Sequence, residues 1–458
     1  MINYILNARS RIFWIALHIL LGAVSILTPW ILIGWFYLVL LTDGMSIIRK
    51  QRNSFIPIVY LIVYTTSFEL LARMSGTSPF IPYELGKYLL LLLLCFGILK
   101  GYRKGNIGWL IVFILLPAAL FDMSGESTVK SIVFNLIGPI NVALAVVFFQ
   151  KQEVNKDNFV DILRLLLYPL VSVLTFTVLG SPSLEDVEFI LGANFATSGG
   201  FGSNQVSTAL GLGAFLVFIL WRKRESFSGY MWLDVVFMLL FAFRGLVTFS
   251  RGGMIGGALG IIVFLLLDRE ISGYGRAIKP VKAILTAIPV FIILAVTFTY
   301  ANSVTGGLLS KRYQGETPGT LAGRKEKTLN VITSNRLQIF NDDLKLWKEH
   351  PVLGVGVGAS RKLRDKSEGF LSHIEISRLL SEHGALGLIY VLILLKLGWE
   401  ILMRQKGMPY GAILASFYII ALFTTFHAAM RTYVSPLLFG LSMLTIVDEG
   451  HDELEIES

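Results

Sequence analysis

The sequence predicts an all-α polytopic membrane protein with 12–14 transmembrane helices and one long extracytoplasmic loop that carries short helices. Three observations support this class. Hydrophobic residues make up 54% of the 458 residues and charged residues only 16%, whereas about 25% of the residues in a soluble domain are charged. Long apolar runs recur along most of the chain. Lys and Arg residues gather in alternate loops between these runs.

Fourteen apolar runs are candidate spans. A helix needs about 20 apolar residues to cross the hydrocarbon, so the shorter runs leave a count of twelve open. The first two runs could instead form one crossing and a re-entrant hairpin. The runs lie at residues 12–28, 29–43, 55–73, 83–99, 107–122, 131–149, 159–180, 205–221, 230–248, 252–268, 283–301, 384–403, 409–426 and 432–447.

These runs divide the chain into four parts. Residues 1–301 hold transmembrane helices 1–11, and residues 302–380 form the extracytoplasmic loop with an amphipathic helix. Residues 381–447 hold the C-terminal transmembrane helices, and residues 448–458 form an acidic cytoplasmic tail.

The basic residues predict which loops lie inside the cell. With the N-terminus inside, every second loop is basic, beginning with Arg49, Lys50 and Arg52, and the other loops are poor in Lys and Arg up to Tyr300. This rule explains the net charge of +9, so we expect no nucleic-acid partner. Cys95 is the only cysteine, which excludes disulfides and Cys-based metal sites within one chain.

Four polar features fall on the outer side in this topology. They are the loop at 197–205, the turn at 250–253, the long loop at 302–380, and His427 with Arg431. A random scatter would divide them between the two sides. We therefore expect one extracytoplasmic site.

The turn Ser250-Arg251-Gly252-Gly253 is the first part of that site. An arginine at the membrane end of a span offers a fork of donors that suits phosphate oxygens, and the glycines let a backbone approach closely. Small residues at this spacing also pack helices together, and both roles can hold. In the glycine-rich loop at 197–205, Asn204 could bind sugar hydroxyls or phosphate, although a flexible outer loop has the same composition.

The long loop contains an amphipathic helix. Apolar residues recur at helical spacing between Asn335 and Pro351, which predicts a helix that ends near the proline and lies on the membrane surface as a lid or side wall. The glycines of 353–358 predict a tight loop rather than a dinucleotide site, because no suitable strand–helix unit surrounds them. Arg336, Arg361 and Arg364 are further phosphate candidates, although solvated loops also carry such charges.

His373 is the best catalytic candidate. A neutral imidazole can take a proton from an attacking hydroxyl near physiological pH, and Glu375 or Glu382 could orient it or share that role. The alternative is an interfacial histidine that caps a helix. Arg431, beside His427, is a further substrate-binding candidate. The spacing of His373, Glu375 and His383 does not match a usual zinc site, so we expect neither a metal ion nor another cofactor.

These residues resemble the O-antigen ligase and polymerase superfamily of bacterial envelope glycan enzymes. The signature is a histidine, a small polar residue, nine residues of any kind and Gly-x-x-G, and His373 stands at that spacing from Gly384-Ala385-Leu386-Gly387. Position 374 is isoleucine, where the ligase form has Asn, Ser or Gln. The elements Gly200-Phe201-Gly202-Ser203-Asn204, Ser250-Arg251-Gly252, Arg336, Trp347 and His350-Pro351 through Gly358 extend the resemblance over about residues 200–390.

The resemblance implies glycan transfer from undecaprenyl-pyrophosphate to an acceptor hydroxyl, at a site of the bacterial cytoplasmic (inner) membrane that faces the periplasm or cell exterior. It assigns the pyrophosphate to Arg251 and Arg336 and the acceptor hydroxyl to His373, without a metal ion and with inversion at the anomeric carbon. All three side chains should then line one outward-facing cavity that opens laterally to lipid.

The acceptor would be a lipid A core for a ligase, or a growing O-antigen or exopolysaccharide chain for a polymerase, and the sequence does not separate the two. A transporter or flippase of lipid-linked sugars is the alternative from another class. Such a protein should carry charges deep in its spans and show related halves, whereas here the polar residues gather at one face.

Overall fold

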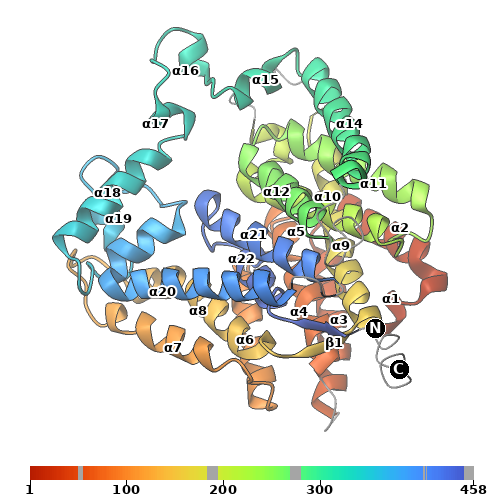
Figure 1. Ribbon diagram of the computed structural model, residues 1–458, viewed down its shortest axis with the longest axis horizontal. Coiled ribbons are helices and arrows are strands. Elements are labelled where there is room, and N and C mark those ends of the chain that lie inside the picture. The colour runs from red at the N-terminus through yellow and green to blue at the C-terminus, as the bar shows by residue number, and fades with distance from the viewer. Residues whose placement is uncertain (50–54, 183–193, 269–279, 406–407, 409, 448–458) are drawn as a thin grey trace.

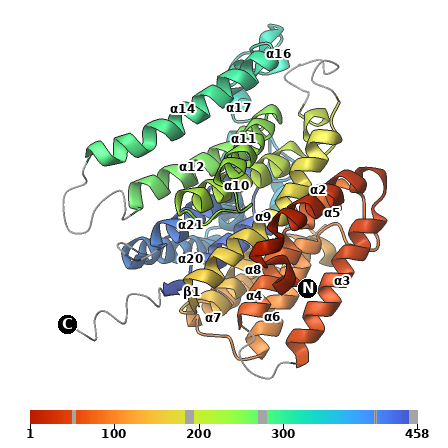
Figure 2. The ribbon, with the colours of Figure 1, turned by 90° about the vertical axis from the view of Figure 1, so that its right-hand side faces the viewer.

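A computed structural model describes residues 1–49, 55–182, 194–268, 280–405, 408 and 410–447. Figures 1 and 2 show a helical assembly in which α14 lies at one outer edge beside α11 and α12. The acidic tail predicted at 448–458 falls outside the described residues.

The helices follow the predicted apolar runs closely. The N-terminal half contains α1 (Ile2–Ile5), η1 (Ala8–Ser10), α2 (Arg11–Leu27), α3 (Trp30–Arg49), α4 (Phe55–Thr66), α5 (Glu69–Met74), α6 (Leu85–Leu99), α7 (Asn106–Leu115), η2 (Pro117–Ala119), α8 (Val129–Phe149), α9 (Lys156–Leu179), η3 (Ala196–Ser198) and α10 (Ser203–Arg222). Then come α11 (Met231–Val247), α12 (Arg251–Leu267), α14 (Pro280–Val304), α15 (Leu308–Tyr313), α16 (Pro318–Leu321), α17 (Leu329–Ile332), α18 (Arg336–Glu349), α19 (Ser360–Leu363), α20 (Glu375–Gln405), α21 (Gly411–His427) and α22 (Val434–Leu441).

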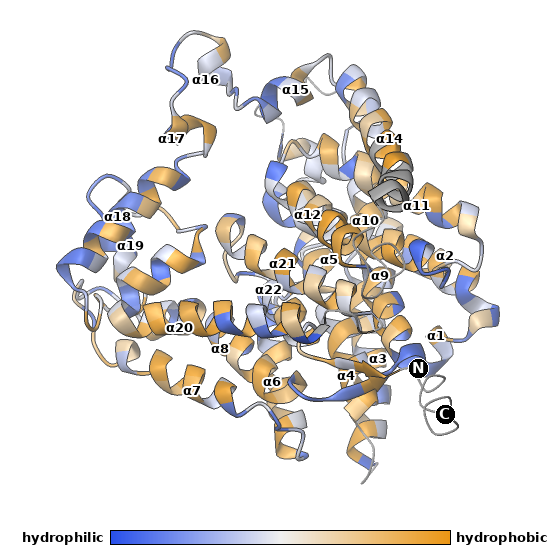
Figure 3. Ribbon diagram, viewed as in Figure 1, coloured by the Kyte–Doolittle hydropathy of each residue, from blue (hydrophilic) through white to orange (hydrophobic). Residues whose placement is uncertain are grey.

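The all-α polytopic membrane class is confirmed. Within the described residues, seven helices are long and apolar enough to cross a membrane, and five further apolar helices are shorter. The first two predicted runs form two separate helices, α2 and α3, and each is a candidate span. In Figure 3, α7 and α12 are predominantly hydrophobic, whereas hydrophilic residues gather on the segment from α15 to α19.

The last predicted run differs from the structure. Its helix α22 ends at Leu441, and the chain continues into the strand β2 (Thr445–Val447), which pairs in parallel with β1 (Glu153–Asn155). These are the only strands among the described residues. The β-branched residues at 445–447 look like the end of a membrane span in the sequence. Their backbone hydrogen bonds are made with β1, and the sequence alone does not show that pairing.

Helix α10 lies at the centre of the assembly. It is buried from Val206 to Leu220 and packs against α11 and α12, while α12 also packs against α21. The contact with α12 depends on glycines: a Cβ on Gly257 would lie 2.5 Å from the carbonyl oxygen of Gly211. The small residues therefore bring these two backbones together, as small-xxx-small spacing predicts.

The polar loop after α14 forms a series of short helices. Helices α15, α16 and α17 run from the end of α14 to the start of α18 at the top of Figure 1, and α18 packs against α20. The amphipathic helix predicted between Asn335 and Pro351 is confirmed as α18. As a result, Arg312 of α15 and Arg336 of α18 lie near the turn that precedes α12.

Candidate active site

The turn before α12 is fixed by α10. Ser250 Oγ donates to Asn204 Oδ1 at 2.8 Å and lies 3.0 Å from Ser207 Oγ. A Cβ on Gly253 would meet the backbone of residues 207 and 208 at 2.2 Å, so the packing interpretation of this glycine is confirmed. Asn204 therefore holds the turn, and the turn places Arg251 as the first residue of α12.

Three arginines meet at this turn. Arg251 donates to the carbonyl oxygen of Ile332, four residues before Arg336. Arg312 Nε donates to the carbonyl oxygen of Phe249 at 3.4 Å. The sequence analysis missed Arg312, because the basic pair at the end of α15 looks like any solvated loop charge.

The positive charge of this arginine cluster, Arg251, Arg312 and Arg336, is not offset within the described residues. None of the three forms an ion pair there. Burial, and then the charges of Arg251 and Arg312, lower the pKa of Arg336. Arg336 Nε and the hydroxyl of Tyr313 are buried and have no hydrogen-bond partner in that part of the chain. Like charges that approach without a counter-charge favour a bound anion.

His373 lies in the segment between α19 and α20, half-buried. Its carbonyl oxygen accepts a hydrogen bond from the Ala429 amide at 3.1 Å, which ties it to the end of α21. Burial, and then the positive charges of Arg431 and Arg336, lower the pKa of the imidazole to about 4. The ring is therefore neutral at neutral pH, the state that a general base requires. Charge interactions also link His373 to Arg336, and Arg336 in turn to Arg251.

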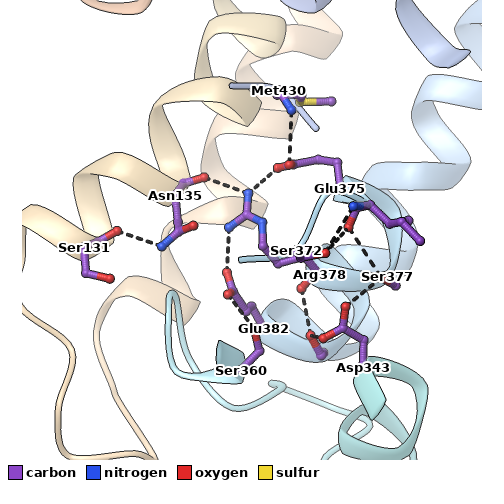
Figure 4. A network of polar contacts seen from close by, with 12 residues as sticks. Ser131, Asn135, Asp343, Ser360, Ser372, Glu375, Ser377, Arg378, Glu382 and Met430 are labelled. Atoms are coloured by element: carbon purple, nitrogen blue, oxygen red, sulfur yellow. Dashed lines mark hydrogen bonds and ion pairs between the residues drawn. The ribbon is translucent and has the colours of Figure 1, made fainter. Parts of the chain in front are cut away.

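Glu375 and Glu382 both face Arg378 (Figure 4). Arg378 Nη1 donates to Glu382 Oε2 at 2.8 Å, Nη2 pairs with Glu375, and the same nitrogen donates to the Asn135 carbonyl at 2.9 Å. No hydrogen bond among the described residues joins either carboxylate to the His373 ring. The sequence analysis missed Arg378, although its i+3 and i−4 spacing to the two glutamates is a visible signal.

A second buried pair joins α18 to this network. Arg364 Nε donates to Asp343 Oδ1 at 2.7 Å, and the hydroxyl of Ser377 donates to Asp343 Oδ2 at 2.6 Å. Arg364 is thus neutralised by a carboxylate, in contrast to the arginine cluster. Removing one partner of such a buried pair is strongly destabilising, so the pair fixes the position of α18 relative to α20.

The glycine loop at 353–358 closes against α20. Its glycines at 354, 356 and 358 have positive φ angles, and the Val355 amide donates to the Ser381 carbonyl at 2.9 Å. Gly384 interrupts α20 with φ 60° and ψ −132°, and the next amide, of Ala385, donates to the Val352 carbonyl at 3.0 Å. The predicted tight loop is confirmed, and Gly-x-x-G begins the long apolar part of α20 at the predicted residue.

Residues 236–392 match the family model described as O-antigen ligase. The matched segment contains Arg251, Arg312, Arg336 and His373, together with the glycine loop and the kink at Gly384. That segment is similar to the O-antigen ligase family. No curated protein matches the chain.

The superfamily resemblance is therefore confirmed, and members of this O-antigen ligase family are glycan-transferring enzymes. Asn204 and Arg431 lie outside the matched segment. No group of three or more His, Cys, Asp or Glu side chains that could hold a metal ion occurs among the described residues.

Arg361 and Arg431 line a cavity beside the O-antigen ligase motif residues. Its volume is about 560 Å³, and Glu382 and Arg378 also line it. Arg361 Nε donates to the Gly369 carbonyl at 2.6 Å, and Arg431 donates to the Ser372 carbonyl. Arg251, Arg336 and His373 do not line this cavity, although the sequence predicts one cavity for all three.

Replacing Gly384 by alanine should destabilise the protein. A Cβ there would lie 2.5 Å from the Val352 carbonyl oxygen and 2.6 Å from the Gly354 nitrogen, in a backbone conformation that essentially only glycine adopts. We expect a loss of about 1–3 kcal/mol or more, measured as a lower unfolding temperature in detergent. Gly369→Ala is the matched control, because Gly369 also has positive φ but nothing within 4 Å of the added Cβ. Equal unfolding temperatures for the two variants would contradict the packing argument.

Proposed function

We propose that this chain is a ligase-like glycosyltransferase that moves a glycan from undecaprenyl-pyrophosphate to an acceptor hydroxyl on the outer face of the bacterial cytoplasmic membrane. The observation that supports the proposal is that the charges of Arg251 and Arg312 act on Arg336, and the charge of Arg336 acts on His373, inside the segment that matches the O-antigen ligase family. The family transfers glycans, and this arrangement supplies both an anion site and a base.

The arginine cluster would bind the pyrophosphate. Guanidinium groups offer bidentate donors to phosphate oxygens, and they stabilise the negative charge that grows on the leaving group as the bond breaks. Arg251 and Arg336 take this role, and Arg312 adds a third charge. Because the three are already gathered without carboxylates, little reorganisation accompanies the charge development.

His373 would activate the acceptor. The acceptor oxygen attacks the anomeric carbon and forms the new C–O bond, while the bond from that carbon to the pyrophosphate oxygen breaks and its electron pair leaves with undecaprenyl pyrophosphate. The hydroxyl proton passes to the His373 imidazole. One displacement of this kind inverts the anomeric configuration, and it uses no metal ion.

The donor chemistry is the same for two acceptors, a lipid A core and a growing polysaccharide. The test is transfer by the purified full chain in detergent, with an undecaprenyl-pyrophosphate-linked glycan and each acceptor in turn. We expect a glycosylated product with one acceptor, released undecaprenyl pyrophosphate and an inverted linkage. No product with either acceptor, together with movement of the donor across proteoliposome membranes, would overturn the proposal in favour of a transporter.

The pH dependence of transfer follows from the environment of His373. Because its pKa is lowered to about 4, the ring accepts protons at neutral pH and loses this capacity only as the pH falls through that value. We expect kcat/KM for the donor to be flat from about pH 6 to 8 and to fall about tenfold per pH unit below about pH 4.

The variant Arg431→Gln tests the cause of that pKa. It removes a positive charge that acts on His373, so the acid limb of the profile should move to higher pH. Lys348→Gln, an exposed residue of α18, should leave the limb in place. Tryptophan fluorescence would check that each variant stays folded at each pH. An acid limb near 6.5 in the unchanged protein, or no shift in Arg431→Gln, would contradict the prediction.

A further inference from the structure

We propose that the cavity of about 560 Å³ between α6, α8, α19 and α20 binds the acceptor and that it selects a saccharide carrying a negative charge, such as a phosphorylated sugar or a uronic acid. This inference rests on the proposed function and adds to it the location and chemical class of the acceptor.

The cavity lies where distant segments of the chain meet. Its lining comes from residues before and within α6, from the start of α8, from α19, from both sides of the start of α20 and from Arg431. These are the chain segments near 82–88, 128–135, 358–364, 371–382 and 431, and most belong to loops or helix ends that the sequence predicts on the outer side. A volume of this size suits one or two sugar rings.

The lining carries surplus positive charge. Among the described residues, Lys130, Arg361 and Arg431 form no ion pair, whereas Arg364 and Arg378 are matched by buried carboxylates. The carboxylate of Glu84 in the same lining pairs with Lys87 at 3.5 Å. Arg378 faces two carboxylates, Glu375 and Glu382, so one of the three cations is offset, and the remaining surplus of positive charge favours an anionic ligand over a neutral one.

Aromatic rings also line the cavity. Tyr83 and Tyr88 of the lining are 52% and 37% exposed, and Phe134 of the lining is half-buried, so these rings are accessible to a ligand in the cavity. The guanidinium of Arg73 stacks over the Tyr83 ring at 4.7 Å from its centroid and fixes its orientation. A lining that holds both aromatic rings and cations suits a ring-shaped ligand with a charged substituent, whereas a bare anion would not contact the rings.

The cavity is joined to the proposed base. Ser372 lines it, precedes His373 in the chain, and accepts a hydrogen bond from Arg431 at its carbonyl. Arg431 thus contributes to the cavity and also acts on His373 through its charge. An acceptor anchored by its charge at Arg361 and Lys130 would present a hydroxyl toward His373, while the arginine cluster holds the donor.

Binding to the purified full chain in a neutral detergent tests the chemical class. The probes are glucuronate and glucose 6-phosphate, with glucose as the neutral counterpart and inorganic phosphate as the bare anion. We expect both charged sugars to bind at least about tenfold more tightly than either glucose or phosphate, since charge-assisted bonds and ring contacts each contribute. Equal affinity for glucose would overturn the charge selection, and equal affinity for phosphate would overturn the saccharide selection.

Variants locate the site. Arg361→Gln and Lys130→Gln should each weaken the charged sugars by at least about tenfold. The matched control is Lys362→Gln, the neighbouring exposed residue, which pairs with Glu126 and does not line the cavity. Unchanged affinity in both cavity variants would overturn the assignment. Sugar binding is also measured in nanodiscs with and without phosphatidylglycerol. If this lipid displaces the sugars and no sugar binds in its presence, the site binds a lipid headgroup and the proposal is wrong.

Kinetics separate this inference from the proposed function. In the transfer assay, Arg361→Gln should raise the KM for the acceptor and leave the KM for the donor unchanged. If transfer proceeds with an unchanged acceptor KM, the acceptor site lies elsewhere although the chain is a transferase. If the unchanged protein transfers nothing to either acceptor, the proposed function fails whatever the cavity binds.

Discussion

His373→Ala is expected to lower the rate of glycan transfer by about 10²–10⁴-fold, the usual contribution of a general base. The imidazole is held neutral by its surroundings, and neither His427 nor His383 is placed to replace it. His427 has both ring nitrogens engaged, by the Phe423 carbonyl and by Thr208. His383 is buried within α20. The loss should therefore fall on kcat, since the donor is bound elsewhere.

The measurement is single-turnover transfer by detergent-purified protein at pH 7.5, a working value well above the pKa of the ring. His373→Gln is the informative partner variant, because it keeps hydrogen-bonding groups at the position but cannot accept the proton. Both variants should bind the donor normally and lose the rate together, and added imidazole should restore part of the rate to His373→Ala. Full activity in both variants, with normal protein levels, would reduce His373 to a structural residue.

Arg336→Ala is expected to lower the transfer rate by about 10²–10³-fold, as for the loss of one preorganised group that stabilises transition-state charge. Arg336 begins α18, its Nε is buried without a partner among the described residues, and the charges of Arg251 and Arg312 act on it. An anion bound there would offset the repulsion among the three. Arg336→Lys should recover only part of the rate, because an ammonium keeps the charge but lacks the planar fork.

The control for this prediction lies in the same loop. Arg324 is exposed between α16 and α17, so Arg324→Ala should leave both kcat and the donor KM unchanged. Arg251→Ala and Arg312→Ala should weaken transfer as well, and the double variant Arg251→Ala with Arg336→Ala should lose less than the product of the single losses, because the residues act on one anion. Strict additivity, or an unaffected Arg336→Ala variant, would show that the arginine cluster does not bind the pyrophosphate as a unit.

The sequence by itself determined the class of the protein and the positions of most of its long apolar helices. Apolar runs bounded by polar loops are a local property of the chain, so α8, α9 and α10 lie within a few residues of their predicted limits. The same holds for α18, whose apolar spacing and closing proline are both local signals. Gly384 is recognised in sequence only as the first glycine of the Gly-x-x-G motif, and its positive φ angle and the crowding around it are shown by the structure.

Only the tertiary structure decided how the charged residues are used. Glu375 and Glu382 lie near His373 in sequence, but helix geometry turns both toward Arg378, which also reaches α8. Arg364 and Arg361 look alike in sequence and line the same cavity, yet Asp343 of α18 neutralises Arg364, whereas Arg361 forms no ion pair among the described residues. Arg312 lies near the turn before α12 because its Nε donates to the Phe249 carbonyl. Arg251 in that turn donates to the Ile332 carbonyl at the end of α17. A charge acquires its role from the partners that surround it, and those partners come from segments far apart in the chain.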